Sequence, residues 1–99
     1  MDTGDLIDAV RAHRVVELCY GGHEARVVHP HAVYRGASGT LFLDGLQVSG
    51  ATRSGSLPGW REFALMRIVD VRVLDSRFEP DPEFNRRSER YRHGLLACA

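Results

Sequence analysis

The chain of 99 residues contains no lysine, and all thirteen of its basic side chains are arginine. Thirteen acidic side chains balance them, so the formal net charge at pH 7 is zero. A dedicated binder of duplex DNA normally carries a basic excess, and the balanced charge argues against that function. Each arginine nevertheless presents a planar guanidinium that suits carboxylates, phosphates and stacked bases, so a local group of arginines would form an anion site.

Cysteine and long apolar segments are equally scarce. Cys19 and Cys98 stand far apart in the chain, which argues against a disulfide framework or a zinc ribbon and favours reduced thiols. No segment approaches the ~20 apolar residues of a membrane span. The first residues, MDTGDLIDAV, carry acids where a signal peptide would carry bases. We therefore expect a cytoplasmic protein without a membrane partner.

The remaining composition is ordinary for a globular domain, with 43% hydrophobic and 26% charged residues. A chain of this length buries about two-thirds of the surface that its unfolded form exposes, and it has room for one core. We therefore expect residues 1–99 to form a single domain.

Hydrophobic periodicity predicts a mainly β fold with a helix at each end. Residues 4–13 place apolar side chains at helical spacing, which predicts an N-terminal helix. A proline-marked entry at Pro80 followed by mixed charges predicts a C-terminal helix over about 81–97. Alternating or β-branched segments predict five strands, over 14–20, 24–35, 40–48, 60–65 and 68–74.

Proline and glycine mark where these strands bend. Pro30 cannot donate to a ladder, so its strand is predicted to bend there or to lie at an edge. Gly45 indicates a bulge or a sharp bend. The Gly/Ser-rich stretch 49–59 is predicted to be a loop that is either mobile or ordered by a ligand. A sheet bent in this way most readily closes on itself, so we expect a small five-stranded barrel over about 14–75.

The segment GWREFALMRI, residues 59–68, fits two patterns. Wound as a helix, it places Trp60, Phe63 and Ile68 on one face, as in an ordinary core helix. Extended as a strand, it places Arg61 and Phe63 on one face and Trp60 on the other. Periodicity alone leaves both structures open.

The order of several motifs resembles the WYL domain family. That family carries a tyrosine before an R-x-V-x-P segment, then a Trp-Tyr-Leu triplet, then R-x-F-x-L-x-R-I, with a phenylalanine about ten residues later. The triplet is degenerate in this chain, whereas the order and spacing of the other motifs match. The corresponding residues, within roughly 6–85, are Tyr20, Arg26-x-Val28-x-Pro30, Leu41-Phe42-Leu43, Arg61-x-Phe63-x-Leu65-x-Arg67-Ile68 and Phe78.

The resemblance implies a barrel similar to Sm and SH3 folds that senses a ligand, without catalytic activity or a cofactor. The family serves in bacterial transcription regulators and in some phage-defence and CRISPR-associated proteins, and several members respond to nucleotides or nucleic acids. Most members carry an N-terminal winged helix-turn-helix, whereas only about a dozen residues precede the first strand predicted here. We therefore expect a separate DNA-binding regulator as a partner. The resemblance also makes 60–65 a strand, with a turn at Met66 before the last strand.

The resemblance places the candidate ligand site around Arg26, Arg61 and Arg67. We expect these three arginines to neutralise the phosphates of a nucleotide or a short single-stranded nucleic acid. Phe42 and Phe63 would offer apolar or stacking surface, since base stacking contributes about 1–3 kcal/mol per base. The alternative is a purely structural role, in which Arg61 and Arg67 form ion pairs that clamp the barrel. The candidate acids for such pairs are Glu24, Glu62 and Asp70.

Two histidines complete the candidate site. In an extended chain His29 and His31 point the same way, so either of them would add a hydrogen bond to a phosphate or sense pH. Paired imidazoles can also begin a metal site, which would suit a metal-dependent enzyme. A metal needs a third and usually a fourth ligand, however, and no nearby motif supplies them. We therefore expect neither a metal nor catalysis.

A protein-interaction module without a small ligand is the alternative function. Small barrels expose sheet edges that pair readily with a second strand. The bent strand around Pro30 or the last strand, 68–74, would supply such an edge. We expect a homo-oligomer in either case.

Overall fold

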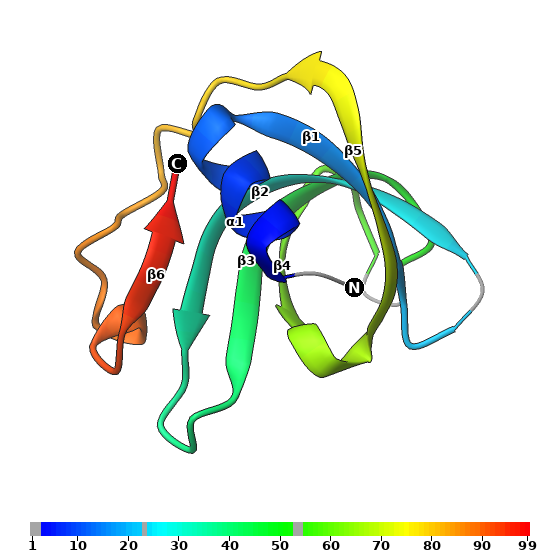
Figure 1. Ribbon diagram of the computed structural model, residues 1–99. Coiled ribbons are helices and arrows are strands. Elements are labelled where there is room, and N and C mark those ends of the chain that lie inside the picture. Colours follow the sequence, from blue (N-terminus) through cyan, green and yellow to red (C-terminus); the bar gives the residue numbers. More distant parts are fainter. Residues whose placement is uncertain (1–2, 23, 53–54) are drawn as a thin grey trace.

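The computed structural model describes residues 3–22, 24–52 and 55–99, and it is mainly β (Figure 1). The chain begins with the helix α1 (Thr3–Ala12), close to the predicted 4–13. The strands that follow are β1 (Arg14–Tyr20), β2 (Ala25–Arg35), β3 (Leu41–Gly50), β4 (Gly59–Ala64), β5 (Ile68–Arg77) and β6 (Leu95–Cys98). Two 3-10 turns, η1 (Leu65–Arg67) and η2 (Glu89–Tyr91), complete the list. No helix in the described part is long and apolar enough to cross a membrane.

The six strands form one antiparallel sheet in the order β4-β3-β2-β1-β5, with β6 paired to β2. The predicted closed barrel is wrong, because no ladder joins β4 to β5 within the described residues and the sheet stays open. The local hydrogen bonds explain the gap: the Ala64 N–H donates to the Tyr20 hydroxyl at 3.0 Å, and the Ile68 N–H bonds back to Leu65 within η1. The backbone at this corner therefore bonds to a side chain and a turn instead of a neighbouring strand.

The segment 59–68 is extended, as the resemblance predicted. β4 ends at Ala64, η1 turns the chain with the Met66 side chain 83% exposed, and β5 begins at Ile68. Phe63 is 1% exposed and points into the core, whereas Trp60 on the other face is 38% exposed. The strand alternation, not the helical one, decides which side chains are buried.

Pro30 separates two pairings along one edge of β2. Residues 25–28 of β2 pair with β1, and residues 32–34 pair with β6. Because proline has no N–H, it fits between the two ladders without losing a bond. The ladder of β2 with β3 has two register shifts, one between Val27 and Val28 and one between Pro30 and Ala32. In the second shift the extra residue lies in β2, and not at Gly45 across from it. Gly45 instead allows close packing, since a Cβ there would collide with a Val28 methyl group.

The predicted C-terminal helix over 81–97 is wrong. The segment runs through turns and η2 and then pairs with β2 as β6. Side chains bond to the backbone two residues onward at three places, from Asp81 to Glu83, from Asn85 to Arg87 and from Ser88 to Arg90. Such local bonds stabilise turns at the expense of a helix. Gly94, at φ +135°, then leads the chain into β6.

Two hydrophobic clusters lie on opposite faces of the sheet. The larger one packs α1 against the inner face, through residues such as Leu6, Val16 and Phe63. The smaller one lies on the outer face of β2 and β3, where the segment 80–98 covers it. Its members are Ala32, Tyr34 and Tyr91, with Phe42, Phe84 and Leu95 packed against them. Strand β4 therefore carries side chains toward two different environments.

Candidate functional site

Two of the three predicted arginines gather around one tyrosine at the inner face of the sheet. The guanidinium carbon of Arg67 lies 4.8 Å from the centroid of the Tyr20 ring, and that of Arg26 lies 5.5 Å from it. Arg26 also lies 5.9 Å from the Phe63 ring, which meets Tyr20 edge to face at 4.9 Å. Gly21, at φ +61°, makes room for Arg67, because a Cβ there would lie 2.7 Å from its Nη2 atom.

The third arginine, Arg61, extends from the same face of β4 as Phe63. Its Nη2 atom donates to the Thr52 hydroxyl at 3.0 Å and to the Ser56 carbonyl at 3.5 Å, on either side of the loop that joins β3 to β4. Residues 53 and 54 of that predicted loop lie outside the described residues. Gly59 leaves space for the guanidinium, since a Cβ there would lie 2.5 Å from Nη1. Arg61 therefore links the strand to the loop.

We call Arg26, Arg61 and Arg67 together the arginine cluster; Arg26 and Arg67 share the Tyr20 ring, whereas Arg61 contacts the loop. None of the three has a carboxylate partner within 4.0 Å among the described residues. The ion pairs of the alternative, structural role, with Glu24, Glu62 or Asp70, are therefore not formed in this part of the chain, and Glu62 pairs with Arg90 instead. A guanidinium without a carboxylate keeps its charge available to another anion.

Three buried polar atoms near the cluster also have no hydrogen-bond partner, namely Arg26 Nε, Arg61 Nε and Gln47 Oε1. Gln47 is fully buried, and its Nε2 donates to the carbonyls of Ser49 and Ala51. An unpaired buried polar group costs about 1–3 kcal/mol, so such atoms are usually satisfied by water or a ligand. Gln47 was not predicted, although a polar residue on the apolar face of Leu43 and Gly45 is a signal for it.

The other predicted site residues lie on the outer face. Phe42 stacks on Tyr34 with ring centroids 5.6 Å apart, and His29 stacks on Phe78 at 5.0 Å. His31 is fully buried, and its two ring nitrogens are both bonded. Nδ1 donates to the His29 carbonyl at 2.8 Å and Nε2 accepts from the Asp81 N–H at 3.0 Å. These bonds fix a neutral imidazole, and burial lowers the pKa of His31.

The two histidines do not begin a metal site in the part of the chain that the structure covers. No group of three or more His, Cys, Asp or Glu side chains there is placed to hold a metal ion. His29 and His31 instead pack against Phe78, which lies 5.0 Å from each ring.

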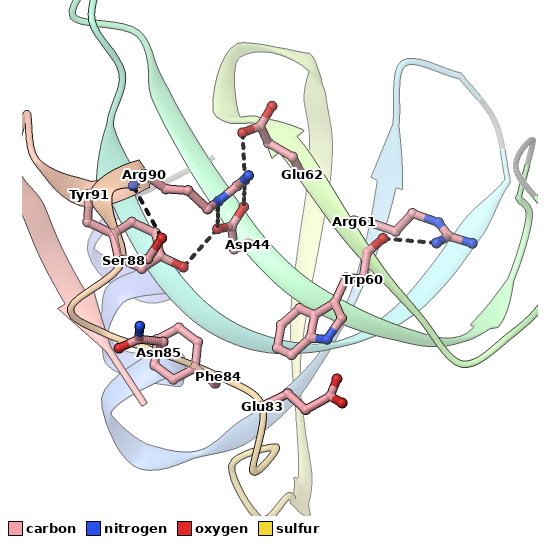
Figure 2. Close-up of a pocket in the computed structure, with 10 residues that line it drawn as sticks. All are labelled: Asp44, Trp60, Arg61, Glu62, Glu83, Phe84, Asn85, Ser88, Arg90 and Tyr91. Carbon is pink, nitrogen blue, oxygen red and sulfur yellow. Dashed lines mark hydrogen bonds and ion pairs between the residues drawn. The ribbon is translucent and has the colours of Figure 1, made fainter.

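A pocket of about 450 Å³ opens on the outer face of β4, between that strand and the segment 83–91 (Figure 2). We call it the outer pocket. Trp60 and Glu62 line it from β4, and Phe84 and Arg90 line it from the C-terminal segment. Figure 2 shows the guanidinium of Arg61 directed away from it. Of the residues that line this pocket, only Arg61 was a predicted site residue, because residues 81–97 were expected to form a helix.

A hydrogen-bonded network closes one end of the outer pocket. Asp44 accepts from Arg90 at 2.9 and 3.1 Å, from the Tyr91 hydroxyl at 2.8 Å and from the Tyr34 hydroxyl at 3.1 Å. Glu62 accepts from Arg90 at 2.9 Å and from Tyr34. Burial raises the pKa of both tyrosines, and the hydrogen bonds to Asp44 raise the pKa of Arg90. Arg90 therefore stays charged and both tyrosines stay neutral, and the network holds the C-terminal segment on the sheet.

Comparison with known proteins gives one structural relative. No family model matches the sequence, and no curated protein matches it. Among solved structures, the chain is similar to proteasome accessory factor B/C (PafBC) of Arthrobacter aurescens, with 27% sequence identity and a TM-score of 0.66. The similarity covers 86% of this chain and 13% of that chain. PafBC contains a WYL domain, so the fold is similar to that of a WYL-containing protein.

Proposed function

We propose that this chain is a regulatory sensing module whose arginine cluster binds a phosphate-bearing ligand, a nucleotide or a short single-stranded nucleic acid. The observation that carries the proposal is that the three arginines of the cluster lack carboxylate partners. Arg14, Arg72 and Arg90 have carboxylate partners, whereas the cluster has none among the described residues. Within the described ranges, Arg26 and Arg61 also differ from exposed arginines that lack a carboxylate partner, such as Arg35, because each has a buried Nε atom without a hydrogen-bond partner. The module binds and does not catalyse.

The geometry supports a division of roles within the cluster. Arg26 and Arg67 flank the Tyr20 ring, so a phosphate between them would meet two guanidinium groups over an aromatic surface. Gln47 Oε1 is a free acceptor, and it would take a hydrogen bond from a base or a sugar hydroxyl. Arg61 would bring the loop after β3 over the ligand. Phe63 is too deeply buried to stack on a base, and it supports Tyr20 instead.

The regulatory part of the proposal is supported by the similarity to PafBC. Because the match spans 13% of that chain, the remaining functions of the relative are not carried over. The sensing module would act on a separate DNA-binding regulator in a bacterial transcription or defence system. Phe42, His29 and His31 point to the outer face, and the proposal leaves them out of the site.

The test is a thermal-shift screen with inorganic phosphate, nucleotides and short single-stranded oligonucleotides. A ligand at a hundredfold excess over its Kd stabilises the folded state by about 2.7 kcal/mol. The variants R26A and R61A should lose most of that shift, whereas R72A, which removes an exposed arginine of the outer surface, should keep it. Unchanged shifts in R26A and R61A would show that the ligand binds elsewhere.

A second candidate function is oligomerisation through β5. This strand ends the sheet, and it carries Val69 and Val73 with exposed fractions of 65% and 37%. An exposed edge with apolar side chains favours pairing with a second strand. Light scattering of the free protein and of a V69K variant would distinguish the two functions. A dimer that V69K dissociates supports the edge contact, and a monomer in both rules it out.

A further inference from the structure

The outer pocket has a preformed aromatic wall. Trp60 is 38% exposed, and its ring lies 6.5 Å from that of Phe84 with an interplanar angle of 28°. The edge contact of His31 with Trp60, at 4.7 Å, fixes the indole from behind. A backbone bond from the Phe84 N–H to the Asp81 carbonyl, at 2.9 Å, fixes the second ring. Two ordered rings beside an open volume suit a flat or cationic ligand.

The charges around the wall are negative. Asp44, Glu62 and Glu83 contribute three carboxylates against the guanidinium groups of Arg61 and Arg90, which leaves one negative charge. Figure 2 shows the Arg61 guanidinium directed away from the pocket, so the carboxylates dominate its interior. Arg90 is already bonded to Asp44 and Glu62. The Glu83 carboxylate has no hydrogen-bond or ion-pair partner within the described ranges. An anion would be repelled from this pocket, and a cation would be attracted.

The carboxylates are also separated in space. Figure 2 shows Glu62 above the Trp60 ring and Glu83 below it, so the aromatic wall lies between two acidic ends. A ligand with one positive charge would satisfy only one end. An aliphatic chain along the rings with an ammonium group at each end would satisfy both, because alkyl ammonium groups combine cation–π contacts with carboxylate hydrogen bonds.

We propose that the outer pocket binds a linear aliphatic amine with a positive charge at each end, a diamine or polyamine. Trp60 and Glu62 alternate along β4 with Arg61 and Phe63, so the outer pocket and the arginine cluster lie on opposite faces of the strand. Arg61 also lines the outer pocket, but its guanidinium is directed away from it (Figure 2). The ligand of the outer pocket has the opposite charge to the phosphate-bearing ligand proposed for the cluster. The two proposals can therefore fail independently.

The test uses Trp60 itself, the single tryptophan of the chain, as the reporter. We expect 1,4-diaminobutane and spermidine to change its fluorescence saturably at constant ionic strength. Butylamine should bind about two- to fivefold more weakly, as expected for the loss of one exposed ion pair. 1,4-Butanediol, which has the same length and no charge, should give no saturable change. A diamine response no larger than that of sodium chloride, or equal binding of the diol, would overturn the proposal.

Matched variants separate the pocket from general electrostatics. The E83Q variant should weaken diamine binding about two- to fivefold, and it should fold normally because Glu83 is exposed. E79Q removes the same charge from an exposed acid outside the pocket and should leave the affinity unchanged. An equal loss in E79Q and E83Q would show that the amine binds the surface without a defined site.

Discussion

The arginines on the two faces of β4 differ in their partners. On the inner face, Arg61 belongs to a cluster of arginines that no carboxylate neutralises within the described residues. On the outer face, the next residue, Glu62, belongs to a network in which Arg90 is fully engaged. Arginine thus stabilises the fold on the outer face, as Arg90, and remains available to a ligand on the inner face, as Arg61. In the part of the chain that the structure describes, the lack of a carboxylate partner, together with a buried Nε atom that has no hydrogen-bond partner in Arg26 and Arg61, is what marks the candidate binding arginines.

The largest effect on stability is expected from the outer network. Asp44 has 8% of its side chain exposed and accepts four hydrogen bonds. D44A leaves the buried Tyr91 hydroxyl without its acceptor, and it leaves Arg90 and Tyr34 with Glu62 as their remaining carboxylate partner. We expect a loss of about 2–4 kcal/mol in the free energy of unfolding, measured by urea denaturation. The control D75A removes the fully exposed partner of Arg14 and should cost no more than about 0.5 kcal/mol. Similar losses in D44A and D75A would contradict a stabilising network.

The pH dependence of stability reports on His31, which anchors the segment after β5 to the outer face. Burial lowers the pKa of His31 in the folded state, so the unfolded chain binds a proton first as the pH falls. The contribution of the neutral imidazole is therefore complete above pH ~6.5, the unfolded pKa, and is lost below it. We expect the free energy of unfolding to decrease between pH 7 and about 5.

The variant H31Q tests the assignment of this pH dependence. It removes the titrating group, so its stability should be lower at pH 7 and should change less between pH 7 and about 5. His29, whose pKa is also lowered by burial, would leave a residual slope in the same direction. A slope in H31Q as steep as in the unchanged chain would assign the effect to other groups.

A smaller effect on stability is expected from the arginine cluster. R67A removes a cation–π contact with Tyr20 and no ion pair, so it should cost less than about 1 kcal/mol. The matched variant R90A leaves the buried Asp44 carboxylate without its guanidinium and should cost clearly more. Chemical denaturation without ligand gives both values. Equal losses of unfolding free energy in R67A and R90A would contradict the view that arginines stabilise the fold on the outer face only.

Much of the sheet was predictable because strand alternation is a local property of the sequence. In 59–68 the resemblance selected the strand, which placed Phe63 and Trp60 on opposite faces, as the structure has them. Which face is buried was not predicted, since Phe63 was expected to offer surface to a ligand and is 1% exposed. The pairing of residues 32–34 of β2 with β6 was not predictable, because residues 95–98 were expected to be helical. The prediction of a C-terminal helix was wrong because short polar side chains such as Asp81 form hydrogen bonds with the local backbone, which stabilises turns.

The candidate site was predictable only in its charged residues. The order of the motifs predicted Arg26 and Arg67 as ligand-binding residues, and in the structure both lie beside Tyr20. The outer pocket was not predictable, since it needs Trp60 from β4 and Phe84 from a segment that sequence patterns made helical. Contacts between residues far apart in the chain decide such pockets, and local periodicity carries no information on them.

The most direct measurement of ligand binding by the cluster is the salt dependence of affinity for a fluorescently labelled single-stranded oligonucleotide. Each phosphate neutralised on a single strand contributes about −0.7 to the slope of log K against log salt concentration, so three arginines predict about −2. R67A should reduce the slope to about −1.4, and R72A should leave it unchanged. Identical slopes in R67A and the unchanged chain, or no saturable binding at low salt, would contradict the assignment.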